Sequence, residues 1–435
     1  MKKKIIFWLI VFPQIGFAQE KIWTMEECIQ YAVQHNPLRN KQEAQNEIYR
    51  LNQCEVIGAF LPSLSAGTGI STNFGRGLDP ETNTYITTNT FSNSYEIYSS
   101  MTLFDGLSQI YRAKLAKINR LRGKEELQNA KDQIALKTME LFFNVLYYKG
   151  TAELAQQQLD ESSQSLKRIR RMEELGLKSI PDVAEIQAKE AEDRFNLTRQ
   201  TNLFKLEIIK LKEIMNFPVD ENLQLAAYEK MLLPVKESAT ATEIYQQALS
   251  SLPQILAAGK SLSASEMEYK IARGRLFPSL SLRAGFSTGF SRLMDNNEYM
   301  PFEEQLKLRQ GAYVAMSLSI PIFDGFSRTS ETKRSRQRLI IAQNQHEELI
   351  RQVYSEIEQA VADVNGLTDE YEHACKRTEA MQSAHLVNLR KYEEGLIDAL
   401  ELSTSANRLL NARVEELYTN LKYQLKRKLL DYYKS

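Results

Sequence analysis

The residues that most often perform catalysis or bind metal ions are few in this chain, and none of them is spaced for either task. Only four histidines occur. His346-Glu347 begins like the His-Glu-x-x-His motif of zinc proteases, but the position of the second histidine is Ile350. The chain has no phosphate-binding glycine loop and no Gly-x-Ser-x-Gly motif. We therefore expect no catalytic residues, no cofactor and no metal site.

Cysteine chemistry is also not indicated. The chain has three cysteines, an odd number that argues against a disulfide framework in an exported protein. Cys28 and Cys54 fall on one predicted helix, 26 residues apart. That separation is about 39 Å at the helical rise, so they cannot form a bridge within the helix. We expect Cys28, Cys54 and Cys375 to be small buried or half-buried side chains.

The N-terminus has the pattern of a signal peptide for export. Lys2 to Lys4 form a basic start, and Ile5 to Phe17 form an apolar core that is too short to span a membrane. Small residues at Gly16 and Ala18 predict cleavage before Gln19. The alternative is an N-terminal helix of the protein core. No cysteine lies at the cleavage point, so a lipid anchor is not expected there.

Composition favours long regular elements and gives no indication of a nucleic-acid partner. Glycine (18) and proline (11) are scarce among the 435 residues. The 55 basic side chains balance the 55 acidic ones, so the chain lacks the basic excess of a nucleic-acid-binding protein. After the N-terminus, no segment reaches the roughly 18 apolar residues that a membrane-spanning helix requires.

The chain carries an internal repeat. Residues 28–72 align with residues 244–288 at a constant offset of 216, and Pro62-Ser63-Leu64-Ser65 is matched by Pro278-Ser279-Leu280-Ser281. After a three-residue shift, Phe104-Asp105-Gly106 is matched by Phe323-Asp324-Gly325. Each half therefore has the same predicted order: a helix, two strands, a very long helix, a tip and a return helix.

A heptad pattern predicts a coiled coil in each half. Apolar or small residues recur at spacings of three and four from Leu127 to Ile169, and the seam from Ile350 to Met381 repeats this pattern in register. A helix of about 69 residues would be about 100 Å long. Shorter amphipathic helices are expected at 25–58 and 244–273. The helices alone would also fit a coiled-coil stalk without a pore.

Four segments alternate between apolar and small polar residues. They are 63–75, 91–103, 279–290 and 312–322. An apolar face outside and a small polar face inside is the pattern of outer-membrane barrel strands. The face predicted to point inward also includes Glu96, Arg283 and Tyr313. A soluble hairpin with one buried face is the alternative, but no globular core is encoded nearby.

Four strands cannot close a barrel. An open sheet edge in lipid leaves N–H and C=O groups unsatisfied at several kcal/mol each, and single-chain barrels need about eight strands or more. The chain must therefore assemble with further copies. Two copies would give about eight strands, whose barrel is filled by its own side chains, and three copies about twelve. An open pore favours three.

The two rims of the predicted sheet have different sequences. Pro62 and Pro278 prevent the preceding helix from continuing into the strand, and Asp105 and Asp324 are predicted N-caps of the long helices. The loops 76–90 and 291–311 are predicted on the extracellular side. An aromatic girdle at the helix rim is predicted from four phenylalanines: Phe60, Phe104, Phe277 and Phe323.

In these features the chain resembles the TolC family of outer-membrane efflux proteins. The resemblance rests on the duplicated Pro-Ser-Leu-Ser, on the Phe-Asp-Gly before each long helix and on the Gly-Leu at each far tip. It implies a mixed membrane α/β fold located in the outer membrane with a large periplasmic portion. Each chain would give four strands to a trimeric, twelve-stranded transmembrane β-barrel, and its helices to a long periplasmic α-helical coiled-coil barrel.

The resemblance further implies the function of a passive exit duct. In a tripartite efflux system or a type I secretion system, the duct would receive cargo from a periplasmic adaptor (membrane fusion) protein and an inner-membrane transporter of the RND, ABC or MFS type. We expect a homotrimer in outer-membrane lipid and no nucleic-acid partner. The alternatives are a periplasmic adaptor-like or structural coiled-coil protein without a pore, and a stand-alone porin, which would not need such long helices.

The resemblance also assigns roles to residues at the predicted tips. In the family, an arginine and a second acidic residue help to hold the tip closed by their charges. This chain has Ile397 and Thr404 at those positions. Glu401 and Asp182 have helix capping as the alternative to a role at the pore constriction, and Tyr392 has seam packing as the alternative. The assignments are adaptor docking for Gly176, Leu177, Gly395 and Leu396, and pore constriction for Tyr392, Glu401 and Asp182.

These patterns give the expected boundaries. They are a signal peptide at 1–18, a first repeat at 19–217, a linker at 218–243 and a second repeat at 244–435. The first repeat should hold strands at about 62–75 and 91–104, a long helix at 106–175 and a return helix at 181–216. The corresponding elements of the second repeat are expected at 278–291, 311–323, 325–394 and 399–433.

Overall fold

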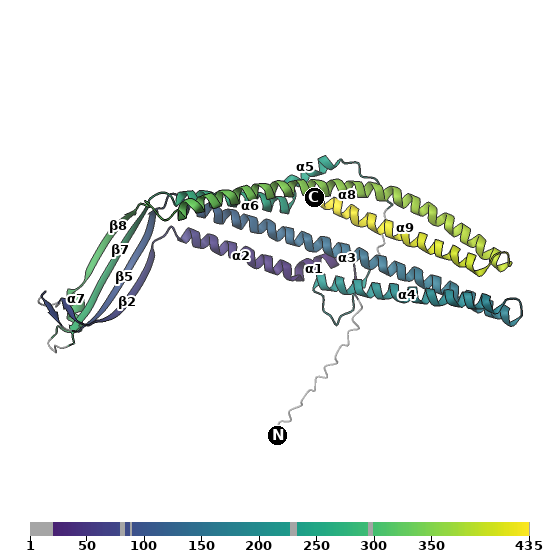
Figure 1. Cartoon of the computed structure of the whole chain (residues 1–435), viewed down its shortest axis with the longest axis horizontal. Helices are drawn as coiled ribbons and strands as arrows, with labels where there is room; N and C mark the ends of the chain where they lie inside the picture. Colours follow the sequence, from purple (N-terminus) through teal and green to yellow (C-terminus); the bar gives the residue numbers. More distant parts are fainter. Residues whose placement is uncertain (1–20, 79–82, 88, 227–232, 295–298, 435) are drawn as a thin grey trace, which may run out of the picture. The chain divides into compact units, whose positions relative to one another are not determined.

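The computed structural model describes residues 21–78, 83–87, 89–226, 233–294 and 299–434, and the expected signal peptide lies outside them. Helices and strands follow one another in a similar order twice along the chain (Figure 1). None of the described helices is both long and apolar enough to cross a membrane.

The chain forms two compact units, and each unit combines segments from both halves of the sequence. The sheet unit comprises Lys41–Asn129 and Leu249–Val353. The hairpin unit comprises the described residues within Met1–Asn40, Ala130–Ala248 and Tyr354–Ser435. The long helices α3 (Ser108–Glu174) and α8 (Ser327–Glu393) belong to both units.

The sheet unit is built on four antiparallel strands. Their order in the sheet is β2 (Ser63–Asn73), β5 (Thr90–Phe104), β7 (Ser279–Leu293) and β8 (Gly311–Ser319). The pairing of β5 with β7 joins the two halves of the chain (Figure 1). In the described residues, β2 and β8 each pair with one neighbour only. A row of unpaired N–H and C=O groups therefore remains along each edge of the sheet.

One face of the sheet is apolar and uncovered over most of its length. Leu64, Ile70 and Val314 on this face are 75%, 71% and 77% exposed. The opposite face carries mainly serine and glycine. Exposed apolar surface costs about 25 cal/mol per Å² in water, so this face is suited to an apolar medium. The alternation predicted from the sequence is confirmed by this arrangement.

The strand ends and loops differ from expectation in three places. β8 ends at Ser319 rather than near 323, because Pro321 has no N–H to continue the ladder. The expected loop 76–90 contains a short hairpin formed by β3 (Arg76–Leu78) and β4 (Tyr85–Thr87). The expected loop 291–311 contains the helix α7 (Phe302–Leu308), which packs against β7.

Each crossing from strand to long helix uses the same Asp-Gly pair. Asp105 Oδ1 accepts a hydrogen bond from the Gln109 N–H (3.0 Å), and Asp324 Oδ2 accepts one from the Arg328 N–H (3.1 Å). Both carboxylates thus satisfy a free N–H of the first helical turn, which was predicted for them. Gly106 has φ +68°, and a Cβ there would lie 2.0 Å from the Gly274 carbonyl oxygen, so only glycine fits.

The segments expected as single helices at 25–58 and 244–273 are each broken by a proline. The first forms α1 (Met25–His35) and α2 (Pro37–Gly58), and the second forms α5 (Ala241–Ser251) and α6 (Pro253–Gly274). Proline is favourable at the first position of a helix but disfavours helical geometry in the residue before it. The prediction of continuous helices was therefore wrong.

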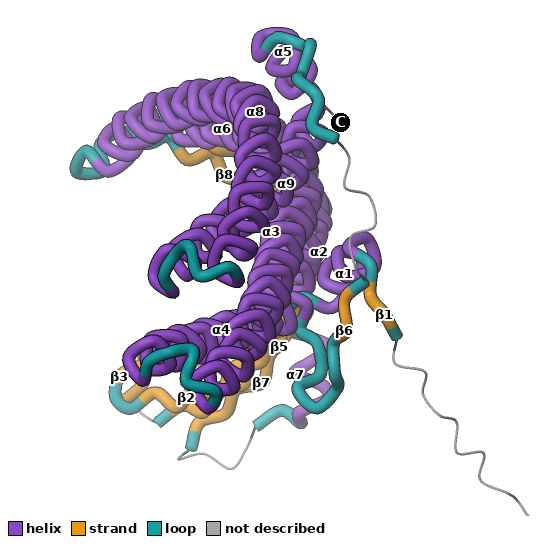
Figure 2. The backbone as a smooth tube through the Cα atoms, turned by 90° about the vertical axis from the view of Figure 1, so that its right-hand side faces the viewer, coloured by secondary structure: helices purple, strands orange, loops and turns teal. Residues whose placement is uncertain are grey.

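The hairpin unit consists mainly of two helical hairpins, in which α3 pairs with α4 (Ile180–Met215) and α8 pairs with α9 (Ala399–Lys434) (Figures 1 and 2). The predicted seams are buried in this unit, and their small residues allow the helices to approach closely. The buried seam positions are Ala130, Ile134, Thr138, Leu141, Val145, Ala155, Leu159, Ser162 and Ile169 in α3, and Ile357, Ala360, Val364, Leu367, Ala374 and Thr378 in α8.

The three cysteines occupy different environments. Cys28 lies in the core of the hairpin unit, and burial raises the pKa of its thiol to about 12. Cys375 is half-buried, whereas Cys54 is exposed on α2. The expectation that all three would be buried or half-buried was wrong for Cys54. All three thiols are free.

The segment between the two halves is anchored to α8 and α9 by Glu237. Its carboxylate is 4% exposed and accepts hydrogen bonds from Lys434 Nζ (2.6 Å), Arg427 Nη1 (2.8 Å) and the Ala239 N–H (2.9 Å). Its N–H donates to Asn365 Oδ1 (2.8 Å). Burial alone would raise the pKa of Glu237, but its hydrogen bonds and the two cations outweigh burial and hold the pKa below its ordinary value of 4.5.

We predict that Glu237→Gln lowers the free energy of unfolding of the hairpin unit by about 2 kcal/mol near neutral pH. The substitution keeps the side chain's shape but removes the charge that Lys434 and Arg427 surround. Because the folded-state pKa is lowered, this stabilisation is fully present well above pH 4.5 and is lost as the pH falls through the lowered pKa. Denaturant unfolding followed by circular dichroism at neutral and acidic pH measures both effects.

The matched control for this substitution is Glu372→Gln, which removes an exposed ion pair with Lys376 on α8. We expect it to leave stability unchanged, because exposed pairs contribute little. A Glu237→Gln protein as stable as the wild type at neutral pH would contradict the anchoring role.

Candidate functional site at the hairpin tips

Both helical hairpins end in the same type of turn. Gly176 (φ +72°) and Gly395 (φ +75°) adopt the left-handed conformation that commonly ends a helix. The turns leave Leu177 and Leu396 66% and 68% exposed. In each turn, two N–H groups donate to carbonyls of the last helical turn: Leu177 to Met172 (2.8 Å) and Gly176 to Glu173 (2.8 Å), then Leu396 to Lys391 (2.8 Å) and Gly395 to Tyr392 (3.1 Å).

The two return helices begin with different caps. At the start of α4, Asp182 Oδ2 accepts hydrogen bonds from the Ser179 N–H (3.0 Å) and hydroxyl (2.7 Å), forming a capping box. These bonds, with the backbone bond the stronger cause, lower the pKa of Asp182. At the start of α9, Asp398 Oδ1 accepts from the Glu401 N–H (2.8 Å). Glu401 therefore contributes its N–H to the cap and leaves its side chain exposed.

Tyr392 of α8 packs against the other hairpin. It contacts the buried cluster around Ile169 and Ile186, and Lys178 Nζ lies 5.3 Å from the centre of its ring. Burial is the main cause that raises the pKa of Tyr392, and the charge of Asp182 adds to it. Within one chain, Tyr392 therefore packs against the other hairpin, and its place at the pore constriction stays a prediction.

Two polar contacts also join the hairpins. Arg168 of α3 forms an ion pair with Glu393 of α8, but both side chains are exposed, so the pair contributes little stability. Lys189 of α4 is 8% exposed and donates to Asp193 Oδ1 (2.7 Å) and to Asn407 Oδ1 of α9 (2.6 Å). A buried cation of this kind depends on all its partners, because loss of one leaves an unpaired buried charge.

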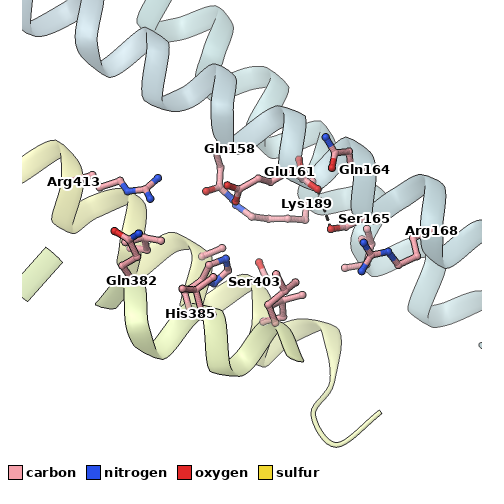
Figure 3. A pocket seen from close by; sticks show the side chains of 17 residues that line it. Gln158, Glu161, Gln164, Ser165, Arg168, Lys189, Gln382, His385, Ser403 and Arg413 are labelled. Atoms are coloured by element: carbon pink, nitrogen blue, oxygen red, sulfur yellow. Dashed lines mark hydrogen bonds between the residues drawn. The ribbon is translucent and has the colours of Figure 1, made fainter. Parts of the chain in front are cut away.

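A cavity of about 250 Å³ lies between the hairpins. Glu161 and Arg168 of α3 lie on one side of it, and His385 of α8 and Arg413 of α9 lie on the other (Figure 3). Burial, assisted by the charge of Arg413, lowers the pKa of His385, which favours its neutral form near pH 7. Within the described part of the chain, no group of His, Cys, Asp and Glu side chains is arranged to hold a metal ion.

The structure brings some of the candidate residues together and keeps others apart. Tyr392 and Asp182 come from different hairpins, but they are close enough for the charge of Asp182 to help raise the pKa of Tyr392. Each Gly-Leu pair instead lies at the end of its own hairpin. Sequence reasoning missed the contacts of Lys189. Its spacing of four from Asp193 is a recognisable signal on a helix, but nothing in the sequence indicates Asn407 as a partner.

Comparison with known proteins gives consistent results. Residues 244–433 match the family model described as outer membrane efflux protein. The pyoverdine export outer membrane protein OpmQ of Pseudomonas aeruginosa is 22% identical over 394 residues, which are 87% of this chain and 79% of OpmQ. The outer membrane efflux protein BepC of Brucella suis is 22% identical over 354 residues, which are 78% of this chain and 71% of BepC.

A solved structure shares the fold. The CmeC outer membrane channel of Campylobacter jejuni superposes with a TM-score of 0.80 at 14% identity, over 94% of this chain and 84% of CmeC. These comparisons identify the class of protein as an outer-membrane efflux channel. They confirm the resemblance to the TolC family of outer-membrane efflux proteins, and the protein is an exit duct in the outer membrane with a large periplasmic helical portion.

We predict that Gly176→Ala and Gly395→Ala each destabilise the hairpin unit by about 1 kcal/mol, because an L-residue with a Cβ is strained at positive φ. Gly366→Ala is the control. Gly366 lies inside α8 with open space around it, so alanine there should stabilise the helix by about 0.5 kcal/mol or more. Thermal unfolding of the three variants measures this difference in sign. Equal effects at all three positions would contradict the assigned turn geometry.

Proposed function

We propose that three copies of this chain form the channel, with the four strands of each copy contributing to one twelve-stranded barrel. The observation that carries this proposal is the pair of unpaired sheet edges at β2 and β8, together with the uncovered apolar face. In lipid, each unsatisfied N–H or C=O group costs several kcal/mol, so the edges require partner strands. Further copies of the chain can supply those strands, and about twelve strands leave room for a lumen where about eight do not.

The helical part is proposed to continue the barrel as a coiled-coil tunnel in the periplasm. α3 and α8 are each 67 residues long, and α4 and α9 are each 36 residues long. These equal lengths support an origin of the two halves by internal duplication. In the proposed tunnel, α3 is therefore equivalent to α8, and α4 is equivalent to α9. Helices of 67 residues measure about 100 Å, which exceeds the thickness of a membrane several times.

The tips are proposed to bind a periplasmic adaptor protein, which connects the duct to an inner-membrane transporter. The proposal follows from the resemblance to the TolC family, which implies such partners. Leu177 and Leu396 are exposed apolar residues on turns fixed by Gly176 and Gly395, which suits a helical partner. A transporter of the RND, ABC or MFS type would supply the energy. The name of OpmQ includes pyoverdine export, so siderophores are one candidate cargo.

Glu401 is proposed to form an acidic ring at the constriction of the trimer, with Tyr392 at the end of the same hairpin and Asp182 at the end of the other hairpin. The exposed carboxylate of Glu401 supports this role, because a side chain committed to capping could not also line a pore. Asp182 is engaged in its capping box and is therefore the weaker candidate.

Native mass spectrometry of the protein extracted from membranes tests the assembly. We expect an ion with three times the mass of the mature chain, and extraction that requires detergent. A monomer that stays in solution without detergent would contradict the channel and favour the adaptor-like coiled-coil alternative.

Deletion of the gene separates a duct from a stand-alone porin. Loss of export on deletion is expected for a duct and not for a stand-alone porin.

Conductance in planar lipid bilayers tests the acidic ring. Three carboxylates around a narrow opening attract cations, so Glu401→Ala should reduce the cation preference measured as a reversal potential in a salt gradient. Glu394→Ala, which removes an exposed carboxylate beside Gly395, is the control and should leave the reversal potential unchanged. An unchanged cation preference in Glu401→Ala would reject the ring.

A further inference from the structure

The polar face of the sheet has an unexpected group of large side chains. Between its ends, this face carries Ser, Thr, Gly and Ala with four exceptions, Glu96 and Tyr98 of β5, Arg283 of β7 and Tyr313 of β8. Directly opposite residues of antiparallel strands point to the same face. The register places the exceptions in three successive rows, which are Gly67–Glu96–Ser287–Gly311, Ser65–Tyr98–Gly285–Tyr313 and Ser63–Ser100–Arg283–Ala315.

Glycine makes room for the aromatic side chains in the middle row. A Cβ at Gly285 would lie 2.6 Å from the ring of Tyr313, so the ring covers the backbone of β7 at this point. Tyr98 lies opposite Gly285 on the other side. Arg283, one row away, places its guanidinium carbon 5.1 Å from the centre of the Tyr98 ring. Tyr98, Arg283 and Tyr313 thus form one contiguous cluster, the tyrosine–arginine band.

Arg283 has no ion-pair partner among the residues that the structure describes, and its side chain is exposed. Glu96 is opposite Ser287, four residues from Arg283 along β7, which corresponds to about 13 Å. The row of Tyr98 and Tyr313 lies between them. The guanidinium is therefore oriented by an aromatic ring and keeps its hydrogen-bond donors available.

We propose that the tyrosine–arginine band is a transit site for aromatic anions inside the barrel. The inference rests on the proposed trimer, in which the polar face lines the lumen and three copies of the band encircle it. Apart from Glu96, the rest of the polar face carries small side chains between its ends, so the residues of the band project far toward the cargo. Arginine pairs with a carboxylate through two parallel hydrogen bonds and stacks on aromatic rings, and tyrosine offers a ring and a hydroxyl.

A purely structural role is the competing explanation. An aromatic side chain that covers a cross-strand glycine stabilises a sheet, and Tyr313 over Gly285 fits that description. This role predicts that tyrosine substitutions weaken the barrel. It does not predict that Arg283 affects which ions interact with the channel.

Channel block in planar bilayers tests the transit site with 1-naphthoate as the aromatic anion and cyclohexanecarboxylate as the non-aromatic one. The wild-type trimer should be blocked by lower concentrations of 1-naphthoate. Arg283→Ser should weaken this block about tenfold, whereas Arg283→Lys should retain part of it, because lysine keeps the charge but not the planar donor pair. Tyr313→Ser should reduce the preference for the aromatic anion.

The matched control is Arg292→Ser. Arg292 lies on β7 as well, but on the opposite face, where its guanidinium carbon is 5.6 Å from the centre of the Phe91 ring. It should leave the block unchanged. Because block requires an open tip, binding of 1-naphthoate to the purified trimer is also measured by saturation-transfer nuclear magnetic resonance, which does not require conduction. The same ranking of the variants is expected.

The outcomes separate this inference from the proposed channel. If the Arg283→Ser trimer and the Arg292→Ser trimer both bind 1-naphthoate as tightly as the wild type, the transit site is overturned and the proposed channel is not affected. Equal block by the two carboxylates overturns the aromatic part of the site. A monomeric protein overturns both proposals.

Discussion

The open edges of one four-stranded sheet are the constraint on which the rest of this structure depends. Among the described residues, β2 and β8 each leave one row of backbone groups without a partner strand, and one face of the sheet is apolar and exposed. In water, exposure of the apolar face costs free energy. In lipid, the unpaired N–H and C=O groups of the edges cost several kcal/mol each. Both costs disappear only when the sheet is completed by other strands inside a membrane. In the proposed trimer, the sheet of one chain is one part of a larger barrel, and the lumen of the duct forms when the other copies complete that barrel.

The helices satisfy a different requirement. Their seams contain residues such as Ala360, Thr138 and Ser162, which give close contact between helices rather than a wide core. Each hairpin turns back at a glycine with positive φ, and the hairpins of one chain are joined by an apolar cluster, by Tyr392 and by Lys189. Stability in this unit is thus distributed along helix contacts, and the tips remain free to expose Leu177 and Leu396.

Much of the fold could be predicted from the sequence, because strand faces and helical seams are periodic signals that depend on local spacing. The breaks at Pro37 and Pro253 and the end of β8 before Pro321 were missed because periodicity was given more weight than the missing N–H of proline. At the candidate site, the turns at Gly176 and Gly395 were predicted from the repeated order of elements and from the resemblance of each Gly-Leu pair to the family's tips. Contacts such as Arg168 with Glu393 or Lys189 with Asn407 join residues more than two hundred positions apart, and a single sequence carries no signal for such pairs.

Amide hydrogen exchange of the protein in lipid nanodiscs tests the central constraint most directly. Strands β5 and β7 have partners on both sides within one chain, whereas β2 and β8 have a partner on one side only. If neighbouring copies complete the sheet, the amides of β2 and β8 should be protected to the same degree as those of β5 and β7. Rapid exchange confined to the outward-pointing amides of β2 and β8, with β5 and β7 protected, would contradict the account.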